Sequence, residues 1–75
     1  MSSNVIPMHN ARAAKAAGVF AQTNIAARRL GYSDHLALRA AQRARDAYKA
    51  GGKSAARVIS EVRESLRRSA DSQLA

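Results

Sequence analysis

The last third of the chain has the clearest hydrophobic pattern. Large apolar side chains recur there every three or four residues, which is the spacing of one face of a helix. These side chains are Val58, Ile59, Val62 and Leu66. Ser54 precedes them and belongs to the residue types that cap helix N-termini. The pattern therefore predicts a helix from the Ser54 cap to about Arg68.

A second amphipathic segment lies between Ser33 and Gly51-Gly52. Serine can cap a helix and glycine can end one, so a helix is expected over residues 34–50. Its polar side is mostly basic. Its apolar side consists mostly of small residues: Leu36, Ala37, Ala40, Ala41, Ala44, Ala47 and Tyr48.

The N-terminal third favours helix, but no single face of it stays apolar. On a helical projection Ile25 falls nearly opposite Phe20. The polar run Gln22-Thr23-Asn24 offers a break, because Thr23 or Asn24 can cap a second helix. The pattern therefore predicts two helices, over about residues 10–21 and 24–30. One continuous bent helix is the alternative.

Composition indicates the fold class. Alanine occupies 18 of the 75 positions and arginine 10, and both are strong helix formers. Residues that favour strands nowhere alternate with polar ones over a useful length. We therefore expect an all-α fold, a small three- to four-helix bundle. Residues 1–9 should form an N-terminal tail, residues 10–68 a single helical domain, and residues 69–75 a frayed C-terminal tail.

The small size of the chain bears on its oligomeric state. A domain of 75 residues buries a small share of its surface, and this one has no cysteine that could form a disulfide. The few large apolar side chains make a stable monomer doubtful. We therefore predict a homodimer, held together by the stripe of Val58, Ile59, Val62 and Leu66.

Charge points to an anionic partner. Thirteen lysines and arginines stand against five acidic residues, which leaves a net charge of +8. A positive field of this kind attracts polyanions, and the planar arginine guanidinium suits phosphate and guanine. Nucleic acid, with DNA favoured, is the expected partner. The alternative is a basic surface that reflects only an alanine- and arginine-rich composition.

Several classes of function are not expected. His9 and His35 have no cysteine or acidic cluster at a spacing that would complete a metal site. No catalytic group or phosphate-binding glycine loop is evident, so we expect no enzyme activity, no metal and no cofactor. The chain has no apolar run long enough to span a membrane and no secretory signal. We expect a cytoplasmic protein that does not bind membranes.

One local motif resembles a known family. Ala27, Gly31 and Tyr32 have the spacing of the helix-turn-helix unit of phage Cro-type repressors and arabinose-regulator-type activators. In those families an alanine packs against the second helix, a glycine follows four residues later, and an apolar residue seats the turn. The resemblance covers about residues 23–42. It departs from the family at Ala37 and Ala40, where the families bury larger apolar residues.

The resemblance implies a recognition helix over residues 34–50. Its exposed recognition positions would be Ser33, Asp34, His35, Leu38, Arg39 and Gln42. The helical projection, taken independently, also exposes four of these. The residues predicted to bind nucleic acid are Arg28, Arg29, His35, Leu38, Arg39, Gln42, Arg43, Arg45 and Lys49. Arg63 and Arg67, on the last helix, are expected to matter less.

The predicted function is that of a DNA-binding regulator or accessory factor. Arg39, Gln42 and Arg43 would read or clamp DNA. The residues expected to hold phosphates are Arg28, Arg29, Arg45 and Lys49. Leu38 would contact a thymine methyl group or anchor a protein partner, or is simply an exposed leucine. The alternative function is that of a helical interaction protein, of the kind found in phages and mobile elements. Its basic face would dock on an acidic surface of a larger protein and inhibit or recruit it.

Overall fold

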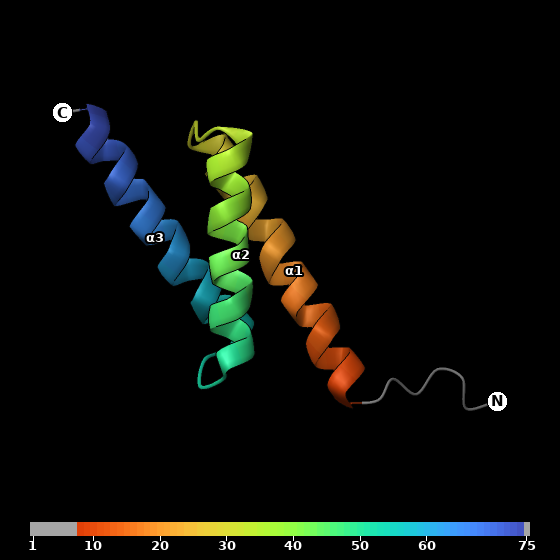
Figure 1. Ribbon diagram of the computed structural model, residues 1–75. Helices are drawn as coiled ribbons and strands as arrows, with labels where there is room; N and C mark the ends of the chain where they lie inside the picture. The colour runs from red at the N-terminus through yellow and green to blue at the C-terminus, as the bar shows by residue number, and fades with distance from the viewer. Residues whose placement is uncertain (1–7, 75) are drawn as a thin grey trace.

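The computed structural model describes residues 8–74 and contains three helices and no strand in that part of the chain (Figure 1). Helix α1 is Met8–Arg29, α2 is Asp34–Ala50 and α3 is Ala55–Leu74. The predicted all-α fold is confirmed. Most of the expected N-terminal tail, residues 1–7, lies outside the described residues, as does Ala75.

Helix α1 is continuous, so the predicted break at residues 22–24 is wrong and the single-helix alternative is confirmed. The physical reason is the position of Thr23, which is completely buried instead of capping a new helix. Val19 and Ala27, one turn away on either side, are buried as well. Ile25 remains 51% exposed, which explains why the region shows no single apolar face in the sequence.

Helix α3 is longer than its hydrophobic pattern indicated. It continues to Leu74, whereas the pattern predicted an end at about Arg68 and a frayed segment after it. Ala70 is half-buried, so the apolar side of the helix extends one turn beyond Leu66. The small size of alanine made this additional turn hard to recognise from sequence.

Helices α1 and α2 lie antiparallel and side by side. Ala27 of α1 clusters with Ala37 at the start of α2, and Val19 clusters with Ala44 further along. The alanines on the inner side of α2 are almost inaccessible to solvent, because their small side chains let the two helices approach closely. Leu36 was assigned to this inner side, but its side chain is 48% exposed.

The residues that carry the family resemblance form the turn between α1 and α2. The Gly31 amide donates to the Arg28 carbonyl at 3.0 Å and the Tyr32 amide to the Ala27 carbonyl at 3.1 Å. This pair of bonds is the Schellman motif, and Gly31 has the positive φ of 95° that the motif requires. The Tyr32 hydroxyl donates to the Leu66 carbonyl at 2.7 Å and so attaches α3 to the turn.

This geometry differs from that of the helix-turn-helix motif in one respect. The two helices of that motif cross at about 90–120°, whereas α1 and α2 pack alongside each other. Contacts extend from Ala27 and Ala37 at the turn to Arg12 and Tyr48 at the far end. The helix-turn-helix resemblance therefore stays a prediction from the sequence.

Both ends of α2 are capped. The Ser33 hydroxyl accepts from the Leu36 amide at 3.3 Å, as the sequence predicted. At the other end Gly51 has a φ of 91°, and the Arg12 guanidinium donates to the Tyr48 carbonyl at 3.3 Å. The Arg12 guanidinium also lies 5.3 Å from the centre of the Tyr48 ring, a cation–π distance. Arg12 thus fastens the first half of α1 to the end of α2.

The apolar stripe of α3 packs inside the chain. Val58 and Leu66 are buried, at 1% and 8% exposure, in two clusters with side chains of α1 and α2. Ile59 and Val62 are half-buried beside these clusters. The stripe that was assigned to a dimer contact therefore has little surface left for a second copy. The homodimer itself stays a prediction.

Thr23 provides a test of the α1 packing. Its hydroxyl is buried and has no hydrogen-bond partner, and an unpartnered buried hydroxyl costs stability. Thr23→Val, which keeps the branched shape, is expected to raise the free energy of unfolding by about 1 kcal/mol. Thr23→Ser, the control, keeps the hydroxyl and removes the methyl group, so it should lower stability. Urea unfolding followed by circular dichroism measures both, and a less stable valine variant would contradict this packing.

Candidate nucleic-acid interface

Ion pairs involve only part of the positive charge. Of the thirteen basic side chains, five lie within 4.0 Å of a carboxylate of the described residues. The pairs are Arg28–Asp34, Arg45–Asp46, Lys53–Glu61, Arg57–Glu61 and Arg68–Glu64. All five are at least partly exposed and therefore contribute little stability.

Glu61 bears two of these pairs. Its carboxylate accepts a hydrogen bond from the Lys53 ammonium at 2.6 Å and one from the Arg57 guanidinium at 3.3 Å. The bond from Lys53, with the nearby positive charges, holds the pKa of Glu61 below its ordinary value. Glu61 therefore stays ionised and paired with Lys53 and Arg57, in the second turn of α3.

The remaining positive charges are free of carboxylates among the described residues. Arg12 is held by the Tyr48 carbonyl. The other side chains without a carboxylate partner are exposed: Lys15, Arg29, Arg39, Arg43, Lys49, Arg63 and Arg67. They represent the part of the net charge that can act on a partner, since each is accessible and not neutralised locally.

The outer face of α2 contains the centre of the predicted binding surface. His35, Leu38, Arg39, Gln42 and Lys49 are all exposed there. The buried alanines lie on the opposite side of the helix, and α2 lies in front of α1 and α3 in the view of Figure 1. The predicted exposure of these side chains is confirmed, because an amphipathic helix with one buried face must present the other to solvent.

Arg43 lies on the edge of α2 that faces α3. Together with Arg39 it lines a shallow hollow whose apolar part includes Tyr32, Leu36 and Leu66. Asp46 also lines the hollow, but its carboxylate forms an ion pair with Arg45. Arg39 and Arg43 are one helical turn apart and have no carboxylate partner of their own.

Two predicted phosphate-binding residues have other contacts. Arg28 lies 3.3 Å from Asp34 and so joins the end of α1 to the start of α2. Arg45 is half-buried, and its guanidinium lies 5.5 Å from the centre of the Phe20 ring. Its Nε is buried and forms no hydrogen bond, although it lies 3.5 Å from an Asp46 carboxylate oxygen. Arg45 therefore belongs to the packing of α1 on α2, which the sequence did not indicate.

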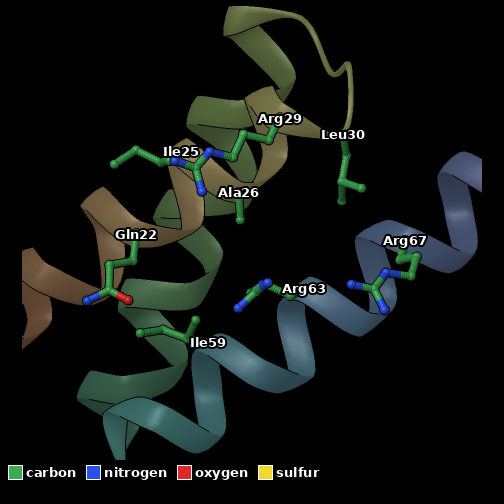
Figure 2. A pocket seen from close by; sticks show the side chains of 8 residues that line it. All are labelled: Gln22, Ile25, Ala26, Arg29, Leu30, Ile59, Arg63 and Arg67. Atoms are coloured by element: carbon green, nitrogen blue, oxygen red, sulfur yellow. The ribbon is translucent and has the colours of Figure 1, made fainter.

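Arg29 lies apart from the α2 surface. It lines a groove between α1 and α3 together with Arg63 and Arg67, the two arginines that were expected to matter less (Figure 2). On each of the two helices, an isoleucine and an arginine that line the groove are four residues apart: Ile25 and Arg29 on α1, and Ile59 and Arg63 on α3. The spacing was visible in the sequence, but nothing there indicated that the two helices would bring these positions together.

No further chemistry is evident in the described part of the chain. Within residues 8–74, no three histidine or acidic side chains come together as they would to hold a metal ion. None of the three helices combines the length and the apolar character that crossing a lipid bilayer requires. Comparison of the chain with protein families, with curated proteins and with solved structures found no match.

Proposed function

We propose that the protein binds nucleic acid, with DNA favoured, through the outer face of α2. The observation that supports this proposal is the set of exposed basic side chains without carboxylate partners, of which Arg39, Arg43 and Lys49 lie on α2. At about 1.5 Å per residue these three span roughly 15 Å along the helix. Phosphates of one DNA strand are about 3.4 Å apart along the duplex axis, so this length matches several of them.

Individual side chains would have different tasks. An α-helix fits the major groove of DNA, where arginine pairs with guanine and glutamine with adenine. Arg39 and Gln42, near the middle of the exposed face, are the residues proposed to contact bases. Arg43 and Lys49 would bind phosphates, and Leu38 would contact a thymine methyl group. In this role the protein would be a DNA-binding regulator or accessory factor.

Self-association belongs to the same proposal. Two copies would present two α2 faces to one duplex and so contact more phosphates than one copy can. A helix-turn-helix-like dimer is the finer form of this idea. The second candidate function, docking on an acidic protein to inhibit or recruit it, is favoured by the three arginines beside exposed Ile25 in the α1–α3 groove.

The test compares two arginine-to-alanine substitutions, which lower the net charge equally. Arg39→Ala is expected to weaken binding to a preferred duplex by about 1–3 kcal/mol and to relax sequence preference at one base pair. Arg57→Ala is the matched control, because Arg57 lies on α3 and already pairs with Glu61. Gel retardation with a panel of duplexes at two salt concentrations measures both, and wild-type affinity should fall steeply with salt. Equal losses for Arg39→Ala and Arg57→Ala would reduce the interaction to diffuse electrostatics, and absence of a retarded band would refute the proposal.

A further inference from the structure

The groove between α1 and α3 is separate from the α2 surface. It is lined by side chains of α1, α3 and the residue that follows α1, and by none from α2. In the close view of Figure 2 α2 passes behind the lining residues, on the far side of the groove. A molecule bound in the groove would therefore leave the outer face of α2 free.

The apolar part of the groove is not covered by the chain itself. Ile25 is 51% exposed and Leu30 36% exposed, and Ile59 across the groove is half-buried. Three large apolar side chains that line one concave surface are a feature of interaction sites. Covering them would remove apolar area from water, which is favourable.

The polar part of the groove is positive. Arg29, Arg63 and Arg67 line it, and none of them has a carboxylate partner among the described residues. Glu64 lines an adjoining hollow together with Arg63 and Arg67, but its carboxylate is 3.5 Å from the Arg68 guanidinium. The positive charge at the groove is therefore available to a negatively charged partner.

We propose that this groove binds an acidic amphipathic helix of a partner protein. Apolar side chains at helical spacing would cover Ile25, Leu30 and Ile59, while carboxylates on the flanks of the helix would pair with the arginines. Binding of an amphipathic helix in an apolar groove is a common mode of peptide recognition. The bound helix would act as the fourth member of a four-helix arrangement. The proposal gives the second candidate function a site and a class of partner, and it does not depend on nucleic-acid binding.

Other occupants fit the groove less well. A second copy in a two-fold symmetric contact would place the three arginines of one groove against the same three of the other, and like charges oppose such pairing. Single-stranded nucleic acid is bound largely by stacking of bases on aromatic side chains. The groove residues include no aromatic side chain, and phosphates gain nothing from contact with Ile25 or Ile59.

The test uses a display library of random, helix-length peptides, selected on the full chain. Peptides that bind Arg63→Ala/Arg67→Ala equally well are removed by counter-selection. The recovered peptides are expected to combine acidic and apolar residues at three- and four-residue spacing. Their affinity should fall about tenfold on the double substitution, as expected for two partly exposed charge pairs. Arg39→Ala/Arg43→Ala, the matched control on α2, should leave it unchanged. Both double variants replace exposed helical residues with alanine, and circular dichroism verifies that they fold.

Three results would overturn the proposal. The first is that no peptide discriminates the wild type from Arg63→Ala/Arg67→Ala. The second is that the selected peptides lack carboxylates. The third is that affinity for a DNA duplex falls as much with the groove variant as with the α2 variant, which would make the groove part of the nucleic-acid surface. Loss of duplex binding with the α2 variant alone concerns only the nucleic-acid proposal, so failures of the two proposals are distinguishable.

Discussion

Replacing Val58 with aspartate is expected to leave most of the chain unfolded. Val58 is 1% exposed and lies where all three helices meet, in a cluster with Val19 of α1 and Ala44 and Tyr48 of α2. A carboxylate there would have no cationic partner within the cluster. Burying an unpaired charge costs several kcal/mol, and small domains have only about 5–15 kcal/mol of stability in total. Helical circular dichroism at moderate temperature measures the loss.

Ile59→Asp is the matched control for this substitution. Ile59 is the next residue of α3 but is only half-buried and lines the α1–α3 groove, so the carboxylate could stay in water. Its variant should retain most of the helical signal. Equal losses of helical signal for Val58→Asp and Ile59→Asp would contradict the burial of Val58 in the core. The same circular dichroism measurement on the wild type, repeated at several protein concentrations, tests the predicted dimer. A dimer that supplies the stability would make wild-type unfolding depend on protein concentration.

The second large effect is expected at an alanine of α2. Ala41 has no exposed surface and lies on the inner side of the helix. Leucine at this position would add three carbon atoms where neighbouring helices approach closely, and such overpacking costs about 1–3 kcal/mol or more. Ala41→Leu should therefore lower the midpoint of urea unfolding, as measured by circular dichroism.

Ala47→Leu is the control that separates the effect of core packing on stability from the effect of leucine on the helix itself. Ala47 is on the same helix but exposed, so the same change adds no atoms to the core. Leucine is nearly as good a helix former as alanine, and the stability of this variant should change by less than about 0.5 kcal/mol. If Ala41→Leu were tolerated equally well, the side-by-side packing of α1 and α2 on small residues would be wrong.

Both ends of α2 and the start of α3 were predictable because local rules determine them. Ser33 and Ser54 accept hydrogen bonds from backbone amides at their N-termini, and Gly51 ends α2 with a positive φ. The buried alanines of α2 also identified its exposed side, so His35 and Arg39 were assigned to the outer face from the sequence alone. Caps and periodicity act within a few residues, which is why the sequence is sufficient for them.

Helix α1 was less predictable because its signals were ambiguous. A threonine in a helix can cap a new segment or fill a small space in a core, and both uses fit the residues around Thr23. The packing of α1 against the other helices decides between them, since Thr23 is completely buried. The same holds for the spacing of Ala27, Gly31 and Tyr32, which suits a helix-turn-helix unit and also forms the Schellman end of α1.

The grouping of the arginines depended on the tertiary structure alone. Arg28 and Arg29 are adjacent in the chain, yet one pairs with Asp34 and the other lines the groove with Arg63. Periodicity relates positions within one helix only. Which positions of α1 and α3 come together depends on the packing between the helices, in which buried alanines and the bond from Tyr32 to the α3 backbone participate. The amino-acid sequence by itself determined the all-α fold, the bounds of α2, the start of α3 and the exposed face of α2, and the packing of three helices decided which charges share a surface.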